Sequence, residues 1–76
     1  MIDKNKYLLA KANGVAETFR GDEISRRICA KYPFSAQIAL LMDKDEKPDE
    51  WAEYQAFRES IKAEVDEEIQ ALEAKI

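Results

Sequence analysis

The chain has 76 residues, a net charge of −4 and 37% charged residues, with no histidine and one cysteine. A Cys/His zinc site, a Ser–His or Cys–His catalytic pair and an internal disulfide are therefore excluded. Two glycines, few aromatic residues and many helix formers favour a mainly α fold. The length is that of a single small domain, so we expect residues 1–76 to form one helical domain.

Residues 3–20 support two interpretations. Asp3 is placed to cap a helix whose apolar side chains recur at helical spacing. The pair Asn13-Gly14 instead favours a β-hairpin with strands 6–12 and 15–20. Alanines argue against strands, and a mid-helix glycine argues against an unbroken helix. We favour a helix broken at Gly14 and keep the N-terminal β-hairpin as the alternative.

Two shorter helices are predicted next. Gly21 is expected to end the first element and Asp22 to cap a helix that Pro33 terminates. A further short helix follows, with Ser35 as its cap. Its large apolar residues are expected to point inward; they are Ile38, Leu41 and Met42.

Residues 43–47 contain no apolar side chain and are predicted to be a polar connector before the long C-terminal helix. Pro48 suits the first position of that helix, and two acidic residues after it complement the helix dipole. Since neither glycine nor proline follows, the helix is expected to run from about 48 to 76.

An apolar stripe follows this last helix. Trp51, Tyr54 and Phe57, in its first part, are expected to anchor the core. A helix of this length is a rod of about 42 Å, whereas a compact chain of this size is roughly 30 Å across. The far end of the stripe, from Val65 on, should therefore face water, and residues 61–76 should form an association surface. Its residues are Ile61, Val65, Ile69, Leu72 and Ile76.

Two alternatives to exposure stay open: the end of the helix frays or bends, or the N-terminal segment folds back along it. The charge pattern bears on this question. Residues 1–42 carry +3 and residues 43–76 carry −7, an asymmetry that can steer one half onto the other, within a chain or between chains. The acidic residues beside the stripe would suit a basic surface; they are Glu64, Asp66, Glu67, Glu68 and Glu73.

No other pattern predicts a site. The carboxylates lack the glycine and spacing of a calcium loop, and no glycine-rich phosphate loop is present. Cys29 fits a small buried residue better than a reactive thiol. The short helix 35–42 offers only Gln37 for reading bases, so nucleic acid is not the expected partner. We expect no catalytic residue, cofactor, metal, small-molecule substrate or membrane segment.

One part of the chain resembles a known group. The segments Lys31-Tyr32-Pro33-Phe34-Ser35-Ala36-Gln37-Ile38-Ala39-Leu40-Leu41 and Lys47-Pro48-Asp49-Glu50-Trp51-Ala52-Glu53-Tyr54 carry the likeness, which extends over residues 31–68. They resemble short proteins encoded in tailed phages and prophages of gut bacteria. Two positions depart from the usual pattern: Pro33 stands in place of a serine, and Met42 in place of an arginine. The likeness therefore does not extend to the cap of the short helix or to one surface contact. It implies a phage context among structural or assembly genes, and no site residues.

The sequence therefore predicts a non-enzymatic phage-type structural or assembly protein that acts by helix-mediated association, as a tail-associated virion component. Its partner would be a phage protein or a second copy of the chain. The alternative is a small acidic regulator or inhibitor that binds a basic host or phage protein. Either would be made in the bacterial cytoplasm, and the first would be virion-associated.

Overall fold

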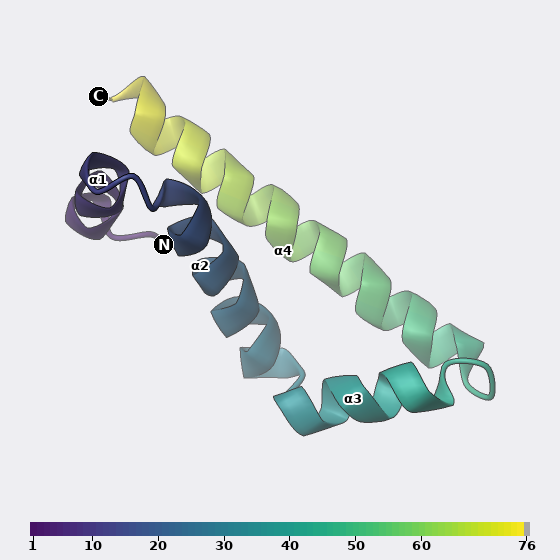
Figure 1. The fold of residues 1–76 in the computed structure, drawn as a ribbon. Helices are drawn as coiled ribbons and strands as arrows, with labels where there is room; N and C mark the ends of the chain where they lie inside the picture. The colour runs from purple at the N-terminus through teal and green to yellow at the C-terminus, as the bar shows by residue number, and fades with distance from the viewer. Residues whose placement is uncertain (76) are drawn as a thin grey trace.

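A computed structural model describes residues 1–75 and shows a mainly α protein with a long C-terminal helix (Figure 1). Within these residues lie α1 (Lys4–Ala12), α2 (Ala16–Lys31), α3 (Phe34–Asp43) and α4 (Pro48–Ala74). No strand is present in residues 1–75, so the alternative of an N-terminal hairpin is wrong. The predicted connector is one residue shorter than expected, because Asp43 still belongs to α3.

The predicted break at Gly14 separates α1 from α2. The Asp3 side chain accepts a hydrogen bond from the backbone N–H of Lys6, which caps α1 as expected. Gly14 has a φ of 72°, a left-handed conformation that glycine adopts without a steric penalty. The backbone therefore turns here, and the Asn13-Gly14 pair ends a helix instead of joining two strands.

The predicted boundary at Gly21 and Asp22 is wrong, because α2 continues through both residues. A glycine inside a helix costs about 1 kcal/mol, so its neighbours must supply more than that. Ile24 and Ile28 are buried in the core on the same helix face. Phe19, before Gly21, also packs against the core. Tertiary packing on both sides of Gly21 thus maintains the helix through a residue of low helix propensity.

The remaining elements are stretched out along α4. Figure 1 shows α1 beside the C-terminal end of α4, α2 alongside its middle, and α3 across its N-terminal end. The molecule measures 47 × 19 × 17 Å with a radius of gyration of 14.8 Å, whereas a compact chain of this length would have about 11 Å. The prediction assumed a compact body, and this elongated arrangement is why it misplaced the stripe.

The stripe on α4 is sheltered by the chain itself. Val65 is 0% exposed, and Ile61 and Leu72 are also buried. Ile69 is partly buried against the same core, which includes Ile2 and residues of α1 and α2. The prediction that this stripe faces water is therefore wrong. The predicted interface along the stripe rested on that exposure, so its basis is removed. Ile76, the last predicted member, lies outside the described residues.

The aromatic residues near the start of α4 pack into this core. Tyr54 is buried, while Trp51 and Phe57 are partly buried against it. The ring of Tyr32 meets those of Tyr54 and Phe57 at centroid distances of 5.1 and 5.5 Å. These contacts join the end of α2 to α4. Helix α3 begins two residues after Tyr32, so its start lies beside this aromatic group.

Helix α3 is the element whose orientation was mispredicted most. It begins at Phe34 after Pro33, and no side chain caps it, so Ser35 does not have its predicted role. None of its residues is buried, and Ile38, Leu41 and Met42 are exposed instead of pointing inward. The residue that packs against the core from α3 is Leu40.

Truncation of Val65 tests the seam between α2 and α4. Val65→Ala should lower the free energy of unfolding by about 2 to 3 kcal/mol, because two buried methyl groups are lost and a cavity remains. Urea unfolding followed by circular dichroism measures this. Val15→Ala is the matched control, since Val15 is 46% exposed, and it should change stability by less than about 0.5 kcal/mol. Equal losses in both variants would contradict the described packing.

Candidate interaction surface

The acidic side of α4 is used within the chain. Arg27 on α2 forms two hydrogen bonds with the carboxylate of Glu68, at 2.5 and 2.9 Å. The backbone N–H of Ile2 donates a third to Glu68, at 2.8 Å. Glu23 and Glu64 also pair with Arg27. Both partners of the central pair are well covered, with 12% and 17% of their side chains exposed.

This cluster shifts the ionisation of its members. The hydrogen bonds from Arg27 lower the pKa of Glu68 from 4.5 to about 2, against the opposing effect of burial. The N–H of Ile2 adds to the lowering. Hydrogen bonds from Arg26 and Arg27 likewise lower the pKa of Glu23. Glu68 and Glu23 are therefore charged at neutral pH, and the cluster fixes α2 and the N-terminus against α4.

Two further ion pairs continue the seam toward the C-terminal end. Arg20 binds Asp66 at 2.6 Å and lowers the pKa of that carboxyl group. Glu73 pairs with Lys11 and accepts a hydrogen bond from the Tyr7 hydroxyl. The hydrogen bond to Glu73 raises the pKa of Tyr7. The basic half of the chain thus meets the acidic half of the same chain, and four of the five predicted acidic residues are engaged internally.

The remaining acidic surface lies at the opposite end of the molecule. Six carboxylates occur between residues 43 and 53, and none of them forms an ion pair with any residue from 1 to 75. They are Asp43, Asp45, Glu46, Asp49, Glu50 and Glu53. Only two lysines interrupt them. This end therefore holds negative charge that α1 and α2 do not neutralise.

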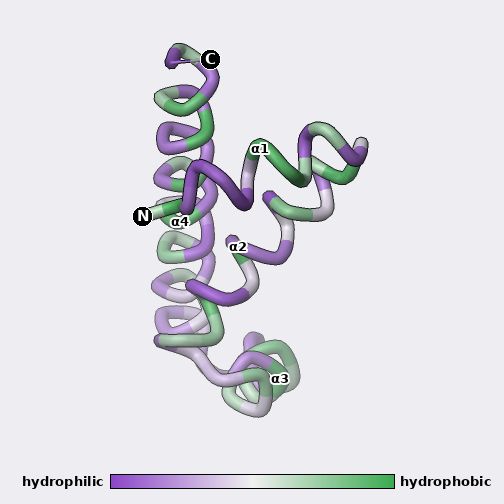
Figure 2. Tube along the Cα trace, turned by 90° about the vertical axis from the view of Figure 1, so that its left-hand side faces the viewer, coloured by the Kyte–Doolittle hydropathy of each residue, from purple (hydrophilic) through white to green (hydrophobic). Residues whose placement is uncertain are grey.

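The same end carries an exposed apolar face. Phe34, Ile38, Leu41 and Met42 are 72%, 44%, 54% and 79% exposed. Their spacing of four, three and one places them on one side of α3. No charged residue occurs from Phe34 to Met42. Figure 2 shows that the tube of α3 is largely green, in contrast to the mixed colours of α4. The most apolar helix is therefore the least buried one.

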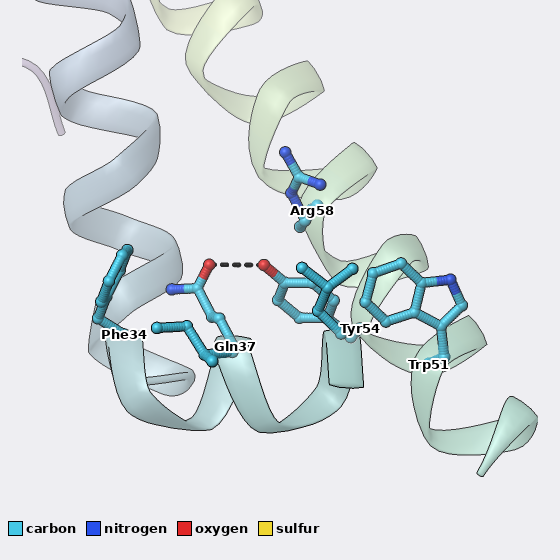
Figure 3. A pocket seen from close by; sticks show the side chains of 7 residues that line it. Phe34, Gln37, Trp51, Tyr54 and Arg58 are labelled. Carbon is cyan, nitrogen blue, oxygen red and sulfur yellow. Dashed lines mark hydrogen bonds between the residues drawn. The ribbon is translucent and has the colours of Figure 1, made fainter. Parts of the chain in front are cut away.

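A groove of about 290 Å³ lies between this face and α4. Its walls are mostly aromatic and aliphatic, and one cationic residue, Arg58, stands at its edge (Figure 3). Phe34, Ile38, Leu41, Trp51 and Tyr54 line it together with Gln37. We call the exposed residues of α3 together with this groove the α3 face.

Gln37 holds α3 in place. Its side-chain oxygen accepts a hydrogen bond of 2.5 Å from the Tyr54 hydroxyl, and its amide donates to the backbone oxygen of Tyr32 at 2.8 Å (Figure 3). One amide thereby links α3 to α4 and to the end of α2. The contact of α3 with the rest of the chain is thus partly polar.

Arg58 has no ionic partner among residues 1–75. Its guanidinium lies 5.7 Å from the centre of the Tyr54 ring. Neither Arg58 nor Phe34 was singled out from the sequence. The signal that could have found the face is the absence of charge from Phe34 to Met42 in a chain with 37% charged residues, since nine consecutive uncharged residues on a solvated helix are unusual.

The chemistry available on this surface is binding by contact. Gln37, Tyr54 and Arg58 supply hydrogen-bond donors, but the groove contains no carboxylate, thiol or amine that could act on a substrate. Within the described residues, no three acidic or cysteine side chains gather closely enough to hold a metal ion. Cys29 is exposed, contrary to the buried position expected for it. None of the helices in residues 1–75 is both long and apolar enough to cross a bilayer.

Comparisons with protein families, with curated proteins and with solved structures find no match for this chain. The α3 face therefore has to be interpreted from its own geometry and chemistry.

Neutralising Glu68 tests the ionic seam. The folded-state pKa of Glu68 is lowered to about 2, so its stabilisation is fully present above about pH 4.5 and is lost as the pH falls toward 2. Glu68→Gln should cost about 1–2 kcal/mol at pH 7 and should flatten the pH dependence of unfolding below pH 4.5. Urea titrations between pH 2 and 7 measure this. Glu67→Gln, on the exposed neighbouring residue, should leave the profile unchanged.

Removal of the Tyr54 hydroxyl tests the attachment of α3. Tyr54→Phe should leave the global fold intact but cost about 1 kcal/mol, since the partly buried oxygen of Gln37 loses its donor. Hydrogen exchange should rise in α3 by about fivefold and stay unchanged in α1. Tyr7→Phe serves as the matched control, because Tyr7 bonds to Glu73 at the other end of the molecule. Increased exchange in α3 for the control as well would contradict the assigned contact.

Proposed function

We propose that this chain is a phage-type structural or assembly protein that works through helix-mediated protein–protein association, with the α3 face as its contact surface. The proposal takes the phage context from the resemblance of residues 31–68. It takes the mode of action from the exposed apolar helix. The stripe on α4, which the sequence favoured for this role, is replaced by α3, because α4 is already covered.

The observation that supports association is that α3, the most apolar of the four helices in residues 1–75, contains no buried residue. Exposed apolar side chains scattered singly are ordinary, but here four of them adjoin one another and a groove. Taken together they expose on the order of 500 Å², given that large side chains carry roughly 150–250 Å² each. A patch of that size rimmed by charge is typical of a protein contact, with the uncharged centre and polar rim that such contacts have.

The alternative function is an acidic regulator that binds a basic protein. The six carboxylates between residues 43 and 53 favour it, because the chain does not neutralise them. Such binding would depend on charge and would weaken strongly between low and high salt. Association through the α3 face is mainly apolar and would change little with salt. This difference separates the two functions in a binding or sedimentation experiment.

A particle assay tests the phage role. In a culture that produces the phage or prophage encoding this chain, a tagged copy should co-purify with virions or with their assembly intermediates. Leu41→Asp should reduce its amount in these particles by about tenfold or more, since a charge would enter an apolar contact. Leu9→Asp is the matched control, because Leu9 is 63% exposed on α1, far from the α3 face.

Two results would contradict the proposal. The first is the absence of the wild-type chain from particles and from every intermediate while the chain is being made. The second is an equal reduction by Leu41→Asp and Leu9→Asp. Salt-sensitive binding to a single basic protein in the same culture would favour the regulator instead.

A further inference from the structure

We propose that residues 1–12 form an exchangeable arm, which in a dimer leaves its own α4 and packs on the α4 of a second copy. In that dimer α1 and α2 join into one continuous helix. The exchange does not use the α3 face and takes place at the opposite end of the molecule. The surface that receives the partner's arm is the one that the arm covers in the single chain, and it stays covered in both forms.

The arm is held by contacts that a second copy can reproduce. Tyr7 and Ala10 of α1 are buried, and so is Ile2 before the helix. The ring of Tyr7 meets that of Phe19 on α2 at a centroid distance of 5.8 Å, and its hydroxyl bonds to Glu73 on α4. Each of these contacts joins the arm to residues that follow it in the chain. Exchange of the arm between two copies therefore restores all of them, which makes a swapped dimer a low-cost state.

A single glycine keeps the arm folded back. The N–H of Gly14 donates to the backbone oxygen of Lys11 at 3.1 Å, and the N–H of Val15 donates to that of Ala10 at 2.9 Å. These two bonds form a Schellman motif, which ends a helix at a residue in the left-handed conformation. Gly14 adopts that conformation with a φ of 72°. No proline occurs before residue 33, so the backbone can also pass through this position as a helix.

The buried residues of the arm are in register with those of α2. Tyr7 and Ala10 are buried in α1, and Ile24 and Ile28 in α2. Steps of three and four residues lie within the two pairs, and the step of fourteen between the pairs is close to four helical turns. A continuous helix over residues 4–31 would therefore present all four side chains on one face.

Such a helix cannot keep its arm on the same chain. Helices α2 and α4 run in opposite directions (Figure 1), and Arg20 pairs with Asp66. Arg20 lies sixteen residues after Lys4, whereas α4 ends at Ala74, only eight residues after Asp66. The arm would thus extend past the end of α4 by roughly 12 Å. Its apolar face and the end of α4 would both lose their cover, and a reciprocal exchange with a second copy covers both.

Gly14→Ala tests the hinge, and Gly21→Ala is the matched control. Alanine disfavours the left-handed conformation and favours the helix, so Gly14→Ala should lower the dissociation constant of the dimer about hundredfold, or about tenfold for each of the two hinges. A Cβ at either glycine meets no atom within 4 Å, so neither variant introduces a clash. Gly21 is helical in both forms, and its replacement should leave the dissociation constant unchanged.

Sedimentation equilibrium between about 1 μM and 1 mM measures these constants, after refolding at each concentration because the arm has to be released before it can exchange. The wild-type chain should dimerise only near the upper end of this range. A wild-type chain that stays wholly monomeric at about 1 mM would overturn the inference, and so would equal dissociation constants for the two glycine variants.

Charge exchange identifies the swapped element. In the Gly14→Ala background, Lys11→Glu and Glu73→Lys each replace the Lys11–Glu73 pair by like charges. When the two variants are refolded together, a mixed dimer restores both pairs only if the arms are exchanged. Mixed dimers should therefore make up about three quarters or more of all dimers, instead of the statistical half. Native mass spectrometry with one variant labelled with ¹⁵N measures this share.

A statistical mixture of dimers would contradict an exchange of the arm. Leu41→Asp, on the α3 face, should leave the Gly14→Ala dimer unchanged, and its loss in that variant would assign the contact to α3 instead. Because these measurements concern α1 and pure protein, they can fail while the particle assay succeeds, and the reverse.

Discussion

The packing of α2 against α4 is the contact on which the rest of this structure depends. Val65 is fully enclosed at its centre, and Arg27 joins Glu68 beside it with the two charged groups largely covered. A chain of 76 residues has a small core, so much of its stability has to come from this one seam. Helix α2 stays regular through Gly21 because of it. The N-terminus is also held there, through Ile2 and its bond to Glu68.

This seam determines what remains exposed. Helices α1 and α2 cover the C-terminal and central parts of α4, and no other element in residues 1–75 covers the apolar residues of α3. Helix α3 nevertheless carries four large exposed apolar side chains. Gln37 anchors this helix to Tyr54 and Tyr32, and Leu40 packs against the core from its other side. The molecule is thereby divided into a self-sufficient end that is paired internally and an end that offers apolar surface, Arg58 and unneutralised carboxylates.

The association proposed above for the α3 face would use the second of these two ends. The distance between the two ends matters as well, because the long helix α4 separates the stable packing from the contact surface. Association can therefore be altered at the α3 face with little effect on the core.

The sequence alone determined the helical class, the break at Gly14, the cap at Asp3 and the long last helix with its aromatic anchors, because local propensities and side-chain periodicity decide such features. It also contained the charge asymmetry that joins the two halves. Only the tertiary structure decided which apolar face is covered. Periodicity identifies the apolar faces on α3 and α4 equally well, but coverage depends on how the whole chain is laid out, and here an elongated layout buries Val65 and Leu72 and leaves Phe34 and Met42 in water.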